Sequence, residues 1–164
     1  MDTAQRKLLP IEIFTDGSSR GNPGPGGYGV ILRCGTHYKE LSAGFPETTN
    51  NRMELTAVIV GLEAVRRPCA EIILYSDSKY VVDSVNKGWV FDWERKNFAK
   101  RLNSDLWIRF LAVYRQHRVR FVWVKGHADN PMNNRCDQLA VAAATAVIKA
   151  SGGKTPEPPP ASAG

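Results

Sequence analysis

The most constraining feature of the sequence is a continuous apolar run at residues 72–75, which stops abruptly at Asp77. A short uninterrupted run of this kind is typical of a strand that is covered on both faces of a sheet. A second strand-like run, at residues 11–15, alternates in polarity and also stops at an acid, Asp16. Because a doubly covered strand needs a layer on each side, we predict an α/β fold with a mixed sheet flanked by helices.

The rest of the chain continues as short strands and helices. Alternation predicts strands, and helical spacing of apolar residues predicts helices, the first capped by Thr49 or Asn50 and ended by Pro68. The glycine-rich residues 18–27 predict a loop or a broad hairpin turn, and their spacing fits neither a dinucleotide nor a Walker A motif. The further strands are expected at 28–33, 37–43 and 119–124, and the helices at 50–67, 78–88, part of 89–100, 105–117 and 133–150.

One folded domain is expected at residues 10–150, between a flexible N-terminus at 1–9 and a disordered tail, rich in Pro, Gly and Ser, at 151–164. The three cysteines form no CxxC pair, which excludes a disulfide framework and a zinc site. No apolar run approaches the ~20 residues of a membrane span, and the N-terminus does not resemble a secretory signal. We therefore expect a soluble cytoplasmic protein.

The positive charge is concentrated in one segment. The chain carries a net charge of +6, and residues 87–125 alone contain ten Lys or Arg and three acids. A charge run is usually a solvated helical face, but cations interleaved with aromatic rings also suit phosphates and bases. The composition favours nucleic-acid contact over plain surface. The aromatic residues of the segment are Trp89, Trp93, Phe98 and Trp107.

Four acids stand among apolar residues. Asp16 and Asp77 end the two strand-like runs, Glu54 lies inside the first long helix, and Asp137 lies in the last one. Taken singly, each could be a helix cap or a favourable charge in a first turn. Together they are harder to dismiss, because acids are seldom buried without a partner. If the two strands end at one edge of the sheet, Asp16 and Asp77 face each other.

Crowded carboxylates repel one another and call for a cation. With few histidines and no nearby cysteine, that cation should prefer oxygen ligands, which indicates Mg²⁺ or Mn²⁺. A basic surface beside a carboxylate-held metal points to phosphoryl transfer on nucleic acid. His127, in a glycine-flanked loop ten residues before Asp137, could reach the same site and move protons or help release a product.

Six longer runs occur in order along residues 11–146: TDGS at 15–18, GNPGPGGYG at 21–29, TNNRMEL at 49–55, SDSKYV at 76–81, WVKGH at 123–127 and RCDQLA at 135–140. Together they resemble bacterial ribonuclease HI, of the type 1 ribonuclease H family. The resemblance implies a five-stranded mixed sheet with helices on both faces. It also implies an endoribonuclease that cuts the RNA strand of RNA/DNA hybrids with little sequence specificity, leaving 5′-phosphate and 3′-hydroxyl ends, as in removal of RNA primers and R-loops.

The same resemblance assigns the four acids to metal binding. Asp16, Glu54, Asp77 and Asp137 match the family's catalytic positions, which would hold two Mg²⁺ ions about 4 Å apart, with Mn²⁺ as a possible substitute. Asp16 would bridge both ions. His127 matches a loop histidine that assists proton movement and product departure.

Substrate contacts follow from the resemblance as well. Asn22, Asn50 and Asn51 resemble minor-groove contacts, where amides meet base edges and the 2′-hydroxyl that distinguishes RNA from DNA. Thr49 and Asn103 resemble a pocket that grips a phosphate of the DNA strand.

A basic protrusion is the last element that the resemblance implies. Trp89, Trp93 and Trp107 match its aromatic residues, with Trp93 lining the DNA channel and Trp107 partly in the core. Residues 94–104 form a shorter protrusion than in well-known bacterial enzymes. Lys79 replaces a common glutamine, and its point charge favours a phosphate over a base edge.

Two other functions share some of these features. A DNA-processing nuclease of the same fold would keep the acids but lack the paired asparagines and the GNPGPGG run. A non-catalytic hybrid-binding module would have lost one or more of the acids, all four of which are present. We expect a monomer whose partner is an RNA/DNA hybrid rather than a membrane, with contact to a single-strand-binding protein as a further possibility.

Overall fold

The computed structural model describes residues 9–68, 70–126 and 130–152, and these contain a five-stranded mixed sheet. The strands lie in the order β3-β2-β1-β4-β5. Strands β1, β2 and β3 are antiparallel neighbours, whereas β4 runs parallel to both β1 and β5. The sheet expected from the sequence is therefore confirmed. The strands are β1 (Ile11–Ser19), β2 (Gly24–Cys34), β3 (His37–Thr48), β4 (Glu71–Ser76) and β5 (Arg118–Trp123).

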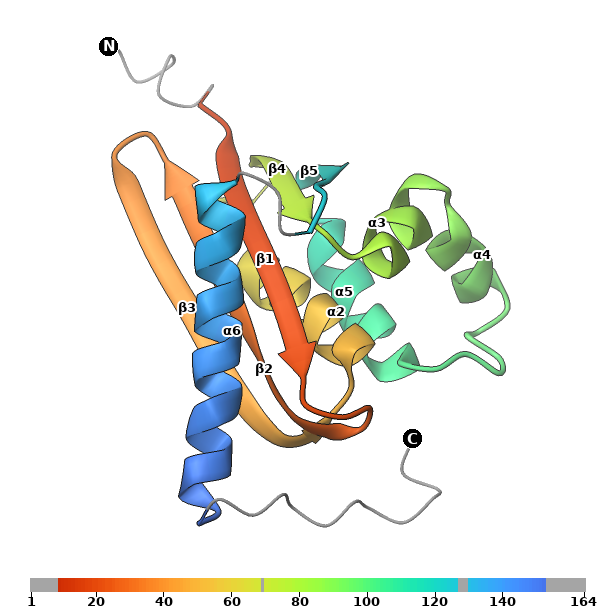
Figure 1. Cartoon of the computed structure of the whole chain (residues 1–164). Coiled ribbons are helices and arrows are strands. Elements are labelled where there is room, and N and C mark those ends of the chain that lie inside the picture. Colours follow the sequence, from red (N-terminus) through yellow and green to blue (C-terminus); the bar gives the residue numbers. More distant parts are fainter. Residues whose placement is uncertain (1–8, 69, 127–129, 153–164) are drawn as a thin grey trace.

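Helices cover both faces of this sheet (Figure 1). The long helix α6 packs against β1, β2 and β3 on one face, whereas α2 packs against β1 and β2 on the other and contacts α5 on its outer side. Helices α3 and α4 project at the side of the molecule (Figure 1). The helices are α2 (Asn50–Glu63), α3 (Lys79–Asn86), α4 (Trp89–Arg95), α5 (Ser104–Tyr114) and α6 (Pro131–Ala150).

The main core lies around α2, which is apolar over most of its circumference because the sheet covers one side and α5 the other. Leu55, Ile59 and Leu62 are fully buried, and Trp107 and Phe110 of α5 complete the layer. Burying each such side chain contributes about 1.5–3 kcal/mol. This layer holds the start of α2 against the end of β1, where the acids lie.

The glycine-rich run that predicted a loop is partly strand. The prediction is wrong for residues 18–19, which end β1, and for residues 24–27, which begin β2, so the chain turns between these antiparallel strands at residues 20–23. A Cβ atom on Gly27 would lie 2.6 Å from the carbonyl oxygen of Ala140 in α6. The absent side chain therefore lets the backbone of α6 pack directly on the sheet. This requirement comes from a segment more than a hundred residues away, so local sequence patterns do not reveal it.

Helix α2 begins as predicted but ends earlier. The Thr49 hydroxyl oxygen accepts a hydrogen bond from the Arg52 N–H at 3.2 Å, so Thr49 is the N-cap. The helix ends at Glu63, one turn before the predicted end at residue 67. Pro68 disfavours helical geometry in the residue before it, so the chain has to leave the helix ahead of the proline.

Helix α6 begins earlier than predicted, at Pro131 rather than at Asn133 or Asn134. The Asn130 side chain accepts the Asn133 N–H at 3.1 Å and caps the helix. Proline suits the first helical position because its missing N–H would have no partner there.

Within the described ranges, no helix is long and apolar enough to cross a membrane. The predicted flexible N-terminus and disordered tail fall outside the described residues, apart from residue 9 and residues 151–152.

Candidate active site

Asp16 and Asp77 meet because β1 and β4 are parallel neighbours. Phe14 of β1 lies opposite Tyr75 of β4, and each acid stands two residues further along its own segment. Because side chains alternate along a strand, this common step directs both acids to the same face. One carboxylate oxygen from each of Asp16, Glu54 and Asp77 lies within 4.8 Å of the others, as expected of two acids that face each other.

Glu54 reaches this pair because Gly17 lets α2 approach β1. A Cβ atom on Gly17 would lie only 2.4 Å from the backbone carbon of Met53. The Gly17 N–H donates to Glu54 Oε1 at 3.0 Å and to Asp16 Oδ1 at 2.9 Å, so one backbone donor holds both carboxylates. Both acids are almost completely buried, at 6% exposure for Asp16 and 8% for Glu54.

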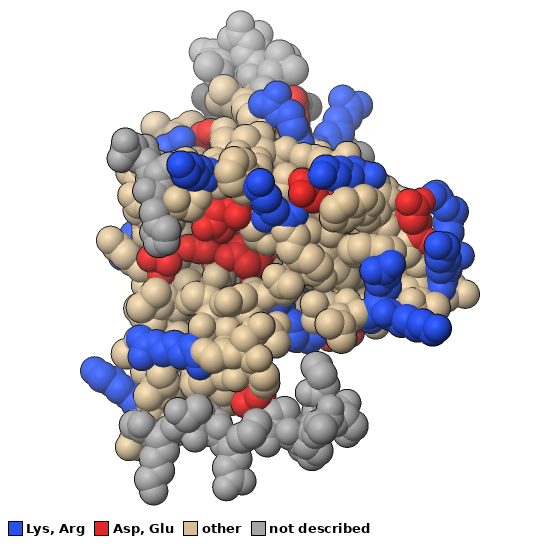
Figure 2. Space-filling view, turned by 45° about the vertical axis from the view of Figure 1, so that its right-hand side comes forward, with Lys and Arg blue, Asp and Glu red and all other residues tan. Residues whose placement is uncertain are grey.

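Asp137 comes to the same place on α6. Gly29 pairs with Asp16 across the sheet, and a Cβ atom there would lie 2.3 Å from the carbonyl oxygen of Cys136. The close packing therefore sets α6, with half-buried Asp137, beside the end of β1. All four predicted acids line one cavity of about 460 Å³. Figure 2 shows a compact red patch of Asp and Glu side chains on this side of the molecule, with Lys and Arg spread around it.

The electrostatics of the cavity follow from crowding and burial. Burial raises the pKa of Asp16 to about 7, and the charges of Asp77 and Asp137 act in the same direction, partly opposed by hydrogen bonds from Glu54 and Gly17. Burial also raises the pKa of Glu54 well above its ordinary value, followed by the charge of Asp16. Without a cation, these two carboxylates retain protons at pH values where exposed acids are ionised.

The donor set fits a divalent cation. Carboxylate oxygens from three segments converge, and Glu54 Oε2 is buried with no hydrogen-bond partner among the described residues. Oxygen donors of this kind are preferred by Mg²⁺ and Mn²⁺. A bound cation would lower the free energy of the ionised carboxylates by supplying the opposite charge that the cavity lacks.

Several uncharged or cationic side chains line the same cavity. Asn50, Asn51 and Lys79 are among the residues that the sequence proposed for substrate contact. Sequence reasoning missed others, because it treated Asn133 and Asn134 only as a helix start and gave Tyr80 no role. The signal was available in part, since Asn133 precedes Asp137 by one helical turn. The missed lining residues are Ser78, Tyr80, Asn133 and Asn134.

The other predicted substrate residues lie near the start of α2. The Asn50 N–H donates to Asn22 Oδ1 at 3.1 Å, and Asn50 Oδ1 accepts the Ser19 N–H at 2.8 Å, so these two asparagines are joined. Thr49 caps α2, and Asn103 precedes α5. The structure therefore gathers Asn22, Asn50 and Thr49 at one end of α2.

Lys79 is held at the edge of the cavity by Trp123. Its ammonium nitrogen lies 4.8 Å from the centre of the indole ring, a cation–π contact. The Trp123 Nε1–H also donates to the backbone oxygen of Asp77 at 3.2 Å. Trp123, to which sequence reasoning gave no role of its own, therefore contacts both the Lys79 ammonium group and the backbone of Asp77.

The predicted basic protrusion is built from α4 and the residues after it. Trp89 is 42% exposed with Lys87 5.3 Å from its ring centre, and Arg101 lies 4.8 Å from that of half-buried Trp93. Trp107, expected to be partly in the core, is fully buried beneath Trp93. The protrusion thus combines an aromatic base with an exposed cationic surface.

The fold divides the basic segment between different surroundings. Arg109 forms an ion pair with Glu63, and Arg115 forms one with Glu94. Arg118 begins β5 beside the start of β4, at the opposite end of the sheet from the acids. Only part of the basic segment at residues 87–125 is therefore free to face a polyanion near the cavity. His127 lies outside the described residues.

A model of the RNase H family matches residues 10–145. The chain belongs to the ribonuclease H family. It is 53% identical to a ribonuclease H of Desulforamulus reducens over 150 residues, which cover 88% of this chain and 94% of that protein.

Solved structures agree with this membership. LC9-RNase H1, described as a type 1 RNase H with the type 2 active-site motif, superimposes with a TM-score of 0.76 at 30% identity, covering 84% of this chain and 73% of that one. LC11-RNase H1, solved in complex with an RNA/DNA hybrid, gives a TM-score of 0.65 at 25% identity, covering 84% and 99%. The expected family, fold and enzyme class are confirmed, and neither the DNA-processing nuclease nor the non-catalytic module is favoured.

Proposed function

We propose that this chain is a metal-dependent endoribonuclease that cuts the RNA strand of RNA/DNA hybrids and leaves 5′-phosphate and 3′-hydroxyl ends. The observation that carries the proposal is the convergence of Asp16, Glu54 and Asp77, with carboxylate oxygens within 4.8 Å, in a cavity that Asp137 also lines. Two Mg²⁺ ions, or Mn²⁺ in their place, suit these oxygens. Bound ions stabilise charge on the scissile phosphate and lower the pKa of a water ligand.

The four acids have distinct positions in this proposal. Asp16 lies close to Glu54 and Asp77 and is also within electrostatic range of Asp137, so it would take part in holding both ions. The other three acids would complete the oxygen ligands of the ions. His127, which lies outside the described residues, would move protons or assist product release.

The asparagines beside the cavity suit the minor groove of a hybrid. Asn50 and Asn51 line the cavity, and Asn22 is bonded to the Asn50 backbone, so all three lie close to the metal site. Amides at this place can contact base edges and the 2′-hydroxyl, which distinguishes RNA from DNA. The hybrid bound to LC11-RNase H1 supports this substrate class. Readout of shape rather than base identity would give little sequence preference.

Phosphate contacts would come from the cationic and hydroxyl side chains around this groove. Lys79 is oriented by Trp123 at the edge of the cavity, where a point charge suits a phosphate of the RNA strand. Trp89 and Trp93, with the cations around them, would follow the DNA strand. Thr49 and Asn103 would hold one DNA phosphate.

The proposal is tested by incubating the protein with labelled RNA/DNA hybrid, duplex DNA and duplex RNA, in Mg²⁺ or in EDTA. We expect the RNA strand of the hybrid to be cut in Mg²⁺ only, with 5′-phosphate ends. Cutting that persists in EDTA, or duplex DNA cut as fast as the hybrid, would contradict it.

The biological setting is proposed from the family. We expect residues 10–150 to act in the cytoplasm as a monomeric catalytic domain on primers and R-loops. Contact with a single-strand-binding protein is a further prediction, which co-sedimentation of the two purified proteins would test.

A further inference from the structure

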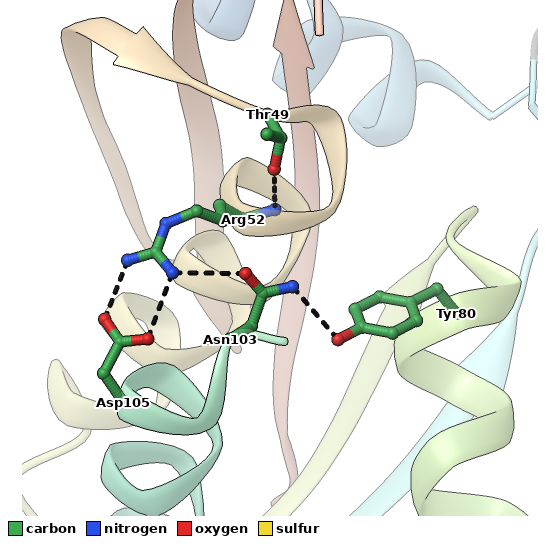
Figure 3. Close-up of polar contacts among 5 residues, drawn as sticks. All are labelled: Thr49, Arg52, Tyr80, Asn103 and Asp105. Carbon is green, nitrogen blue, oxygen red and sulfur yellow. Dashed lines mark hydrogen bonds and ion pairs between the residues drawn. The ribbon is translucent and has the colours of Figure 1, made fainter. Parts of the chain in front are cut away.

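A network of side chains joins the start of α2 to the start of α5 (Figure 3). The Arg52 guanidinium donates to both carboxylate oxygens of Asp105, at 2.8 and 3.1 Å. The same guanidinium donates from Nη1 to Asn103 Oδ1 at 3.2 Å. Arg52 and Asp105 neutralise each other, and the fork geometry of the guanidinium allows it to hold the acid and the amide at once.

Arg52 determines which way the Asn103 amide points. A guanidinium has donors only, so the amide must turn its oxygen toward Arg52 and its NH₂ group away. That NH₂ group donates to the Tyr80 hydroxyl oxygen at 3.2 Å. The same oxygen accepts a hydrogen bond from the Trp107 Nε1–H at 2.8 Å. Asn103 adopts a left-handed backbone conformation, with φ of 64°, that asparagine tolerates better than most residues. Its second amide hydrogen has no acceptor among the residues that the structure describes and can be donated to a ligand.

Thr49 is also tied to Arg52, through the backbone. Its hydroxyl oxygen accepts the Arg52 N–H at 3.2 Å, so the hydroxyl hydrogen is left to donate elsewhere (Figure 3). On both Thr49 and Asn103, therefore, the acceptor is bound by Arg52 and a donor remains. Two donors without a competing acceptor suit an anionic oxygen.

We propose that the Arg52–Asp105 ion pair is a positioning device that orients Asn103 as a hydrogen-bond donor to one phosphate of the DNA strand, beside the Thr49 hydroxyl, which the Arg52 backbone N–H holds. The inference rests on the proposed function for its ligand and goes beyond it in assigning Arg52 and Asp105. Because the pair is neutral overall, it contributes orientation and not attraction. Its loss should weaken binding of the hybrid and leave the metal site unchanged.

The test compares Arg52→Lys with a matched control, Arg109→Lys. Arg109 on α5 forms a similar two-bond ion pair with Glu63 on α2, so both variants weaken the same helix–helix contact. Lysine keeps the charge but cannot hold the acid and the amide together. Affinity is measured by fluorescence anisotropy in EDTA, with hybrids in which one DNA phosphate at a time is replaced by a neutral methylphosphonate.

In the wild-type protein, methylphosphonate replacement at one particular DNA linkage should reduce the affinity for the hybrid about tenfold. This is the effect expected for loss of a charge-assisted hydrogen bond. Arg52→Lys should weaken binding of the unmodified hybrid by a similar factor, raise KM with kcat changed less than about twofold, and abolish the effect of that linkage. Arg109→Lys should retain the effect. Asn103→Asp, which keeps the bond to Arg52 but lacks the amide donors, should also abolish it.

Three results would overturn the inference: no sensitive DNA linkage in the wild-type protein, equal sensitivity in Arg52→Lys, or equal weakening by both arginine variants. If the wild-type protein binds the hybrid with this linkage pattern but does not cut it in Mg²⁺, the proposed function fails and the positioning role stands.

Discussion

In the cavity, Asp16 and Glu54 are buried against other carboxylates, whereas at the joint between α2 and α5 the carboxylates of Glu63 and Asp105 each face a guanidinium. The pKa changes run in opposite directions. Burial raises the pKa of Asp16, while the hydrogen bonds from Arg52 lower that of Asp105. An ionised carboxylate therefore destabilises the folded state in the cavity, where it lies against other carboxylates, and modestly stabilises it at the joint, where an arginine is paired with it.

The largest expected effect comes from removing one acid of the cavity. Asp16→Asn should reduce hybrid cleavage by about 10³-fold or more, since loss of a group that stabilises transition-state charge is severe. The variant should fold, and without metal its free energy of unfolding at pH 7.5 should rise by about 1–3 kcal/mol, because the buried charge is gone. Cleavage assays and urea unfolding check both. Wild-type turnover in this variant would show that the metal site lies elsewhere.

The pH dependence of stability should differ between the two regions. The pKa of Asp16 is about 7 in the folded chain, above its unfolded value of about 4. Between these pH values the folded state retains a proton that the unfolded state has lost, so stability falls as pH rises from 4 to 7, by up to about 3 kcal/mol.

The free energy of unfolding is measured by urea unfolding in EDTA, at pH 4 and at pH 7.5, for the wild-type protein and for Asp16→Asn. The stability of the wild-type protein relative to the variant should fall between the two pH values. The difference isolates Asp16 from acids such as Asp105, whose lowered pKa places its contribution at lower pH. A difference that does not grow with pH would contradict the assignment.

Divalent metal should offset the loss of folding stability that the buried, crowded carboxylates of the cavity cause. Mg²⁺ at about a hundred times its dissociation constant should stabilise the folded protein by about 2.7 kcal/mol, since it binds the folded state only. Thermal unfolding at pH 7.5 with and without Mg²⁺ measures this shift, which should be much smaller in Asp16→Asn. Equal shifts in both proteins would mean that the metal binds outside the acids.

The smallest effect should come from the paired region. Glu63→Gln removes one carboxylate from the joint between α2 and α5 and should cost only about 0.2–1 kcal/mol, because its pair with Arg109 is partly exposed. Cleavage should be unchanged within error. A loss of activity comparable to that of Asp16→Asn would show that this joint contributes more than support.

Much of the site followed from local patterns. Asp16 and Asp77 are predicted to meet, and the parallel register of β1 and β4 brings them together. The expectation that the first strand ends at Asp16 is wrong, because β1 continues to Ser19 in its pairing with β2. Thr49 was recognised as a possible cap from its place before a helical pattern. The cap was predictable because capping depends mainly on neighbouring residues, whereas the end of β1 depends on its pairing with β2.

Other features depend on partners far along the chain. The glycines at the start of β2 were predicted as a loop, and only the contact with α6 explains them as strand. The basic segment looked uniform, yet Arg115 is neutralised by Glu94 and Arg118 lies at the far end of the sheet. Arg52 and Tyr80 lie in two of the runs that carry the family resemblance, but sequence reasoning gave them no role, because their roles depend on the side chains that they contact.

The sequence by itself determined which groups are charged, where strands and helices begin to form, and which acids are surrounded by apolar residues, since these depend on composition and on spacing along the chain. Only the tertiary structure decided which charges are paired, how far Asp16 is from Glu54, and which cations remain for a polyanion. Electrostatic energy depends on distance and burial in space, and a chain brings together residues as remote as Asp16 and Asp137 only when its sheet and helices are packed.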